Sequence, residues 1–169
     1  MGINDSSIVL RPIGIIRTEH TVKEKTPIQP AYAMDSYGEA ILFPEFSAGL
    51  KDLEGFSHIY LLFHLHQAKG MKLEVKPFLQ NVLRGLFATR APCRPNPIGL
   101  SIVELIKIEG NSLYFRGADM LDGSPLLDIK PYSAKFDSIA STRNGWQDDV
   151  SAEYAEKYGR RGYRPKGGI

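Results

Sequence analysis

The chain has 169 residues, of which 43% are hydrophobic, so it can form one ordinary domain with a packed core and has little length left for a second. Its single cysteine, Cys93, excludes an internal disulfide and a cysteine-rich zinc site. The formal net charge of +2 permits a polyanionic partner without requiring one. The first residues lack the apolar core of a signal peptide, and no apolar run approaches the roughly 20 residues that span a bilayer. We therefore expect a cytoplasmic protein that does not enter membranes.

Seven segments have the short, β-branched or alternating patterns of strands and end at proline, glycine or polar turns. In chain order they are residues 13–18, 38–43, 57–66, 73–76, 98–108, 113–116 and 126–130. Residues 57–66 are almost continuously apolar and aromatic, which is typical of a strand covered on both faces. The sequence Glu109-Gly110-Asn111 predicts a hairpin turn between the fifth and sixth segments.

A convincing helix pattern occurs only near the end of the chain. Asp148, Asp149 and Glu153 suit a helix start, Lys157 suits its last turn and Gly159 its termination. Residues 51–53 fit a short helical turn. Strands separated by turns, without long amphipathic helices, predict a mainly β fold, namely a single antiparallel β-barrel with a short C-terminal helical tail. Because the strand pattern stops at 132–134, we place the barrel domain at 8–134 and a basic, aromatic tail at 135–169.

Two long loops, 23–34 and 90–97, contain several prolines, which restrict the backbone and can hold side chains in fixed directions. They are either binding loops or stiff connections. In the second loop, Arg90 and Arg94 are candidates to bind an anion or to form surface ion pairs. Cys93 between them is either a thiol activated by nearby positive charge or a small side chain, and we favour the second interpretation.

The histidines raise the possibility of a metal site. His64 and His66 would lie about 6.6 Å apart on one strand face, while His58 is too far away to share an ion with them. A two-histidine site would need a carboxylate from elsewhere. We expect hydrogen-bonded histidines and no metal, and we keep a metal-dependent barrel enzyme as an alternative.

Two acidic residues lie in different predicted structures, Asp122 in a turn and Asp128 in a strand. Asp122 precedes Gly123 and suits a turn, whereas Asp128 lies between apolar neighbours in a predicted strand and needs a partner or a task. Lys130, on the same strand face, is one such partner. The sequence has no glycine-rich dinucleotide motif and no Walker motif, so any adenosyl cofactor must be held by loops and strand ends.

Several motifs, in this order, resemble those of the TsaA-like (TrmO-like) tRNA adenine-N6 methyltransferases. They are Ile13-Gly14-Ile15-Ile16-Arg17-Thr18, Gln29-Pro30, Gly49-Leu50, Leu53-Glu54-Gly55-Phe56-Ser57-His58, Gly85-Leu86-Phe87-Ala88-Thr89-Arg90, Arg94-Pro95-Asn96-Pro97-Ile98-Gly99, Asp122-Gly123-Ser124-Pro125 and Asp128-Ile129-Lys130-Pro131-Tyr132. The resemblance covers residues 11–132. It implies a homodimeric β-barrel that binds S-adenosylmethionine near the subunit boundary. It also implies transfer of a methyl group to a threonylcarbamoyl-modified adenosine beside the anticodon of tRNA.

By position in these motifs, the resemblance implies two groups of functional residues. The cofactor contacts would be Pro30, Ala31, Tyr32, His66, Gln67, Arg90, Leu100, Ala118, Asp119, Met120, Leu121 and Asp122. The catalytic group would be Asp128, Lys130, Pro131 and Tyr132.

In that catalytic group we expect Asp128 to accept or hydrogen-bond a proton of the adenine amine, and a backbone carbonyl near Pro131 to orient the amine. Tyr132 would stack on the base. Lys130 would bind phosphate or pair with Asp128. The grouping is analogous to the Asp-Pro-Pro-Tyr motif of other adenine-N6 methyltransferases, with different spacing.

Longer members of the group carry a C-terminal domain, whereas fewer than forty residues follow Tyr132 here. The tail mixes charged and aromatic residues, so it would either follow a phosphate backbone or form a solubilising disordered end. Its members are Tyr158, Arg160, Arg161, Tyr163, Arg164 and Lys166. The alternative to an enzyme is a non-catalytic module that binds S-adenosylmethionine or RNA.

Overall fold

A computed structural model of the chain describes residues 7–163 and contains a closed, six-stranded antiparallel barrel. The barrel strands are β1 Gly14–Thr18, β2 Tyr37–Leu42, β3 His58–His64, β6 Ile98–Glu109, β7 Ser112–Arg116 and β8 Ser124–Pro131. Their order around the barrel is β1-β2-β7-β6-β3-β8, and β8 pairs with β1 to close it. The predicted mainly β barrel is confirmed.

Six of the seven predicted strands are barrel strands. The segment 73–76 is different: its strand, β4 Glu74–Val75, pairs only with β5 Arg84–Gly85 in a small separate ribbon. Pro77 stops β4 after two residues, because proline cannot donate to a ladder. The predicted strand 57–66 is also shorter than expected, since β3 ends at His64.

Helical structure is short and lies outside the barrel. The α-helices are α1 Ala134–Asp137 and α2 Ala152–Gly159, and α2 confirms the predicted helix near the end of the chain. The 3₁₀ turns are η1 Lys23–Lys25, η2 Pro30–Tyr32, η3 Pro44–Leu50, η4 Leu53–Gly55, η5 Leu86–Ala88 and η6 Gly145–Asp149.

Alternating residues of the strands fill the barrel. On β3, Ile59, Leu61 and Phe63 are buried while the residues between them are partly exposed. Two glycines make room for phenylalanine rings. Gly99 is the register partner of Phe63 and Gly38 that of Phe115, and a Cβ on either glycine would lie within 2.4 Å of the ring opposite. The narrow barrel therefore needs glycine opposite phenylalanine.

A β-bulge on β8 determines where its polar residues point. Phe63 pairs with Leu126 but Leu62 pairs with Asp128, so Leu127 is an extra residue. After the bulge Asp128 shares the outward face with Leu62, and Lys130 shares it with Tyr60. The bulge thus turns two polar side chains away from the core.

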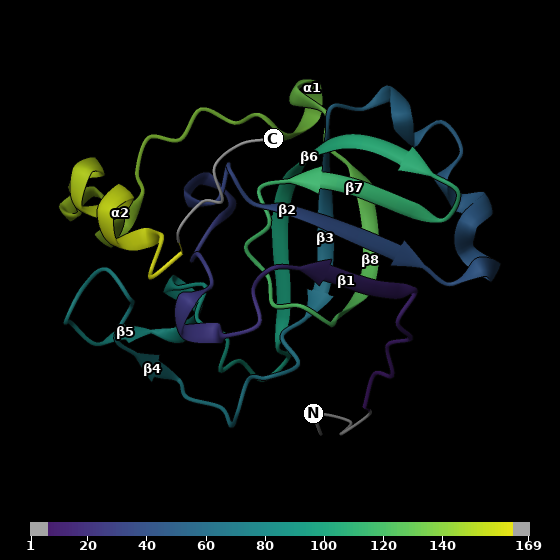
Figure 1. Cartoon of the computed structure of the whole chain (residues 1–169). Helices are drawn as coiled ribbons and strands as arrows, with labels where there is room; N and C mark the ends of the chain where they lie inside the picture. Colours follow the sequence, from purple (N-terminus) through teal and green to yellow (C-terminus); the bar gives the residue numbers. More distant parts are fainter. Residues whose placement is uncertain (1–6, 164–169) are drawn as a thin grey trace, which may run out of the picture.

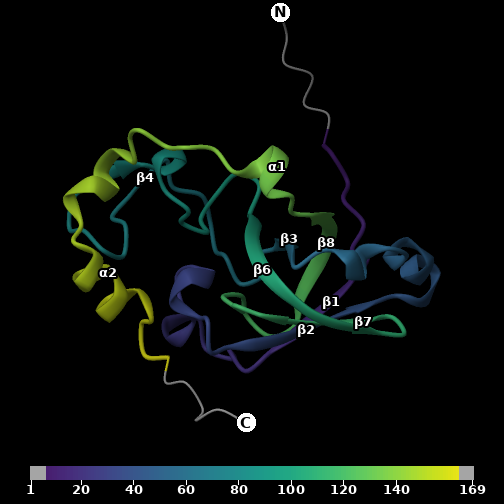
Figure 2. The same ribbon diagram turned by 90° about the horizontal axis from the view of Figure 1, so that it is seen from above.

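The barrel carries different additions at its two ends. Figure 1 shows η3 and η4 (residues 44–55) beyond one end, and the ribbon β4–β5 with α2 at the other; the view in Figure 2 separates them in the same way. We call the second end the mouth, defined by the ends of β1 and β3 and the starts of β6 and β8. Most of the predicted cofactor residues lie in segments that meet there.

Candidate functional site

A buried histidine ties together the loops of the mouth. His20 is 5% exposed, and its Nε2 lies 2.9 Å from both Ser36 Oγ and the Ala118 carbonyl oxygen. Burial lowers the pKa of His20, although the Ala118 carbonyl and the charge of Glu19 act in the opposite direction. The His20 imidazole therefore connects residues 20, 36 and 118, which come from separate segments.

Asp119 is the carboxylate enclosed by the mouth. The residue is partly exposed as a whole, but protein surrounds its carboxyl, which accepts a hydrogen bond of 2.6 Å from Ser101 Oγ on β6. Burial raises the pKa of Asp119 to about 7, while the Ser101 hydrogen bond and the charge of Arg90 act to lower it. Arg90 in turn donates to Gln29 Oε1. An acid, a guanidinium and an amide thus meet at this end of the barrel.

The other residues of the predicted stretch 118–122 have mainly structural roles. The side chains of Ala118 and Met120 are part of the core. Asp122 accepts from the Thr18 backbone N–H at 3.1 Å and pairs with Arg17 at 3.3 Å, which fixes the end of β1. A ligand at this stretch would meet backbone atoms and the side chain of Asp119, together with the partly exposed Leu121.

The loop Pro30–Tyr32 lies between the barrel and the C-terminal segment. A Cβ on Gly117 would be 3.5 Å from Pro30, and a Cβ on Gly159 would be 2.6 Å from the Tyr32 ring. The Ile28 backbone N–H also donates to the Gly159 carbonyl at 3.0 Å. The described part of the predicted tail therefore packs against the predicted cofactor loop, whereas Arg164 and Lys166 lie outside the described residues.

Further contacts fix the tail at the mouth. Arg160 pairs with Asp35 at 3.5 Å, and the rings of Tyr163 and His20 pack edge to face with centroids 5.2 Å apart. Ala31 is exposed beside this contact region, in the same 3₁₀ turn as Tyr32. This end of the molecule is built from both the barrel and the segment after it.

His66 and Gln67 follow the end of β3 at the mouth. His66 is partly buried, with Nδ1 3.4 Å from Ser124 Oγ, and Gln67 is exposed. His66 is not in the strand with His64, so the prediction that they share a strand face is wrong. Within residues 7–163 no group of three or more His, Cys, Asp or Glu residues is arranged to hold a metal ion.

The two arginines of loop 90–97 have different roles. Arg94 Nη1 donates to the Thr89 carbonyl at 2.9 Å and makes longer contacts with the carbonyls of Leu86 and Ala91. Arg94 therefore holds its own loop together, and the guanidinium of Arg90 is the one that faces Asp119. Cys93 between them is partly buried.

Leu100 lies apart from the mouth group. Ser101 faces inward to Asp119, so its neighbour Leu100 faces outward, where it is 52% exposed. Leu100 pairs with Leu62, which pairs with Asp128. Of the predicted cofactor residues, Leu100 is thus the one on the same barrel face as the predicted catalytic group.

The predicted catalytic group forms a second cluster, which we call the outer-face site: Asp128, Lys130 and Tyr132 with Tyr60. Asp128 and Lys130 form an ion pair of 2.8 Å, with side chains 43% and 61% exposed. The Tyr132 ring lies 5.8 Å from that of Tyr60, centroid to centroid. Pro131, which lies between Lys130 and Tyr132 in the chain, is exposed.

Two members of this neighbourhood were not predicted from the sequence. Tyr60 lies outward beside Lys130, and its pKa is raised first by desolvation and then by the charge of Asp137. Asp137 is in α1, and its carboxylate also accepts from the Ser133 backbone N–H at 2.7 Å. The alternation of β3 could have indicated Tyr60, but the position of Asp137 depends on how α1 folds back.

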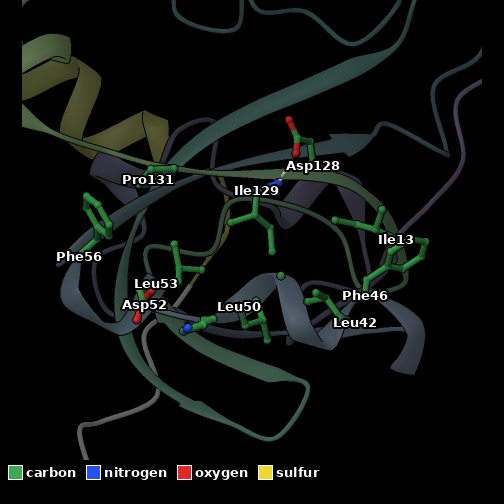
Figure 3. Close-up of a pocket in the computed structure, with 12 residues that line it drawn as sticks. Ile13, Leu42, Phe46, Leu50, Asp52, Leu53, Phe56, Asp128, Ile129 and Pro131 are labelled. Atoms are coloured by element: carbon green, nitrogen blue, oxygen red, sulfur yellow. Dashed lines mark hydrogen bonds between the residues drawn. The ribbon is translucent and has the colours of Figure 1, made fainter.

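A cavity of about 420 Å³ lies at the opposite end of the barrel from the mouth, under η3 and η4. Its lining is mainly apolar: Ile13, Leu42, Phe46, Leu50, Leu53, Phe56, Ile129 and Pro131, with Gly49, Lys51, Asp52 and Asp128. Figure 3 shows Ile129 pointing into this cavity and the Asp128 carboxylate pointing away from it. The Asp128 carboxylate therefore does not point into this cavity.

The fold and the mouth together define a class: a small antiparallel β-barrel protein with a polar, loop-built region at one end. Residues 15–138 match the family described as tRNA-methyltransferase O N-terminal domain. The chain belongs to this family. No helix within residues 7–163 is long and apolar enough to cross a membrane.

Relatives with assigned names agree with this placement. The chain is 52% identical over 139 residues to a probable S-adenosyl-L-methionine-binding protein of Pyrococcus abyssi, covering 82% of this chain and 76% of the relative. It is 37% identical over 145 residues to the human tRNA (adenine(37)-N6)-methyltransferase, covering 80% of this chain but 32% of the human protein.

Solved structures show the same fold. The crystal structure of TrmO from Pseudomonas aeruginosa aligns with a TM-score of 0.70 at 41% identity, over 83% of this chain. This chain spans 62% of that structure. A further Pseudomonas TrmO structure aligns with a TM-score of 0.72 at 40% identity, covering 87% of this chain and 64% of that one.

Proposed function

We propose that this protein is an S-adenosylmethionine-dependent methyltransferase that methylates N6 of an adenosine beside the anticodon of tRNA, with a threonylcarbamoyl group already on that adenosine. The observation that carries the proposal is the acid Asp119 at the barrel mouth, which is hydrogen-bonded to Ser101 and near enough to Arg90 for the charge of that guanidinium to act on its pKa. Together with family membership, it supports a site for a small zwitterion.

The residues of the mouth suit the chemistry of this cofactor. S-adenosylmethionine carries a sulfonium that supplies the methyl group, an ammonium, a carboxylate and an adenine. The Asp119 carboxylate suits a cationic group and Arg90 suits the carboxylate. Tyr32 and His66 offer ring faces to a base. A cation beside Asp119 would favour its ionised form and so release a proton on binding at neutral pH.

The outer-face site suits the acceptor base. Asp128 accepts the proton, or the hydrogen bond, of the adenine amine, whose lone pair is otherwise delocalised into the ring. Tyr132 stacks on the base, and the Pro131 carbonyl orients the amine. Lys130 holds Asp128 in place through their ion pair and faces solvent where a phosphate could approach.

The separation of the mouth and the outer-face site within one chain supports the proposal of a homodimer. Ser124 beside His66 and the acid Asp128 are four residues apart on β8, about 13 Å, so one chain leaves a gap between mouth and outer face. The outer face of β6 carries Ile98, Leu100 and Ile102, which are 38–52% exposed. A second copy placed on this apolar face would bring its own mouth close to Asp128.

The dimer is tested by Ile102→Asp, with Val22→Asp as a matched control on an exposed residue elsewhere. Analytical ultracentrifugation should give a dimer for wild type and for the control, and a monomer for Ile102→Asp, because a charge in an apolar interface is costly. A wild-type monomer at all concentrations would contradict the proposal.

The activity is tested with radiolabelled cofactor and two tRNA preparations, one carrying threonylcarbamoyladenosine and one transcribed without modifications. We expect label in RNA with the modified preparation only. Cofactor binding by calorimetry without labelled RNA would instead favour a non-catalytic S-adenosylmethionine-binding module.

A further inference from the structure

Two segments of the chain are rich in positive charge, the tail after Glu156 and residues 69–94. Residues 69–94, which we call the basic arm, contain one acidic residue, Glu74, and six basic ones: Lys69, Lys72, Lys76, Arg84, Arg90 and Arg94. The arm therefore carries +5, and the rest of the chain carries −3. Among residues 7–163, none of the ion pairs involves the arm. Arg94 is held by the carbonyls of its own loop and Arg90 faces the mouth, so the charges left for a partner outside the chain are those of the exposed lysines of the arm.

The same arm exposes large apolar side chains. They are Met71, Leu73, Phe78, Val82, Leu83 and Phe87. Phe87 is 74% exposed, and the Arg94 guanidinium lies 5.6 Å from the centroid of its ring. Exposed aromatic rings among basic side chains are typical of surfaces that bind unpaired nucleic-acid bases and their phosphates.

The arm is held in place before any partner binds. The Leu86 backbone N–H donates to the Leu73 carbonyl at 2.8 Å, so the arm folds back on itself. Trp146 Nε1 donates to the Ala88 carbonyl at 2.7 Å, which fixes the arm to the C-terminal segment. Arg90 reaches the mouth through Gln29. A ligand lying on the arm would therefore lie next to the mouth.

We propose that the basic arm is the RNA-binding surface of this protein, with Lys69 and Lys72 on phosphates and Phe87 stacked on an unpaired base. The inference rests on the proposed function, because it takes the substrate to be an RNA. It assigns to residues 69–94 the role that the composition of the tail first suggested for residues 158–166. Lys69 and Lys72 are exposed and make no ion pair within residues 7–163, so their charges are available.

The test measures binding of a fluorescent anticodon stem–loop RNA by anisotropy across a salt series. Lys69→Ala with Lys72→Ala should weaken binding at least about fivefold at 0.1 M salt and reduce the salt slope by about 1.4 to 1.8. Phe87→Ala should weaken binding about tenfold with an unchanged slope, because stacking releases no counterions. The control, Lys51→Ala with Lys107→Ala, removes the same charge from exposed lysines away from the mouth and should leave affinity within twofold of wild type.

The outcomes separate this inference from the proposed function. If wild type methylates tRNA but both arm variants bind RNA as wild type does, the inference about the arm is overturned and the proposed function stands. If wild type binds the stem–loop through the arm but transfers no methyl group, the arm is supported and the enzymatic proposal fails. Equal loss of affinity in the control would show dependence on net charge alone and overturn the assignment to the arm.

Discussion

The mouth and the outer-face site differ in how their polar groups are supported. At the mouth, His20 is buried and Asp119 is partly buried, and both are hydrogen-bonded to residues of distant segments. At the outer face, Asp128 and Lys130 bond mainly to each other and remain 43% and 61% exposed. An exposed ion pair contributes at most about 1 kcal/mol to stability, so stability does not account for this pair. The difference indicates that the mouth is organised to bind before any partner arrives, whereas the outer face becomes a desolvated site only when something covers it.

The largest predicted effect would separate chemistry from binding. Asp128→Asn keeps the shape of the side chain but removes the proton acceptor, so turnover should fall at least about a hundredfold. The affinity for S-adenosylmethionine should stay within about twofold of wild type, because Asp128 lies outside the mouth. Single-turnover kinetics and calorimetry measure the two quantities.

Lys130→Gln is the companion variant, since it breaks the same ion pair and keeps the acid. Its turnover should fall less than that of Asp128→Asn. Equal losses in the two variants would mean that the pair, and not the carboxylate, is what the reaction needs.

The second prediction concerns how Asp119, at the mouth, makes the stability of the protein depend on pH. The folded-state pKa of Asp119 is raised from 3.8 to about 7, so folding favours the protonated form. Its contribution to stability is full below about pH 4 and is lost as the pH rises through 7. Between pH 5 and 7 this loss is at most about 2 kcal/mol. Asp119→Asn cannot ionise, so it should gain stability relative to wild type over that range.

Urea unfolding of wild type and Asp119→Asn at several pH values measures this difference. Asp148→Asn is a suitable control, because Asp148 is exposed and its pKa is lowered by hydrogen bonds from Asn144. Parallel stability curves for wild type and Asp119→Asn would mean that the acid is not desolvated in the free protein.

The contrast between the regions also explains what the sequence could predict. Strand-like sequence patterns identified β1, β2, β3, β6, β7 and β8. The continuous apolar run of β3 predicted a strand covered on both faces, whereas in the structure only alternate residues of β3 are buried, as a barrel requires. The alternation at 73–76 also predicted the strand that contains β4, but nothing predicted the two-residue β5 or the separate ribbon that the two strands form. Asp128 stood out because an acid inside an apolar strand has few structural explanations.

Contacts between distant segments were not predictable in the same way. The positions of Asp119 and Arg90 at one site came from family motifs, and nothing local to either residue predicts the hydrogen bond from Ser101 to Asp119. Arg90 and Arg94 appeared equivalent in the sequence, but the carbonyls of its own loop hold Arg94 in place. The packing of the tail on Tyr32 likewise depends on the three-dimensional fold.

These two arginines provide the third prediction. Arg90→Ala should weaken S-adenosylmethionine binding about tenfold without lowering the melting temperature, because the side chain is exposed and faces the mouth. Arg94→Ala should lower the melting temperature instead, since three backbone carbonyls lose their donor. Calorimetry and thermal unfolding on both variants measure the contrast, and unchanged affinity in Arg90→Ala would remove that residue from the cofactor site.

The smallest effect would show whether the C-terminal helix is part of the mouth. A methyl group on Gly159 would lie 2.6 to 2.8 Å from the Tyr32 ring, so Gly159→Ala must displace that ring. If Tyr32 contacts the adenine, affinity for S-adenosylmethionine should fall about threefold, on the order of 0.7 kcal/mol. Gly162→Ala is the matched control, because its new methyl would meet Lys25 at an ordinary 3.5 Å. Equal affinities for the two variants would place Tyr32 outside the cofactor site and leave α2 as packing alone.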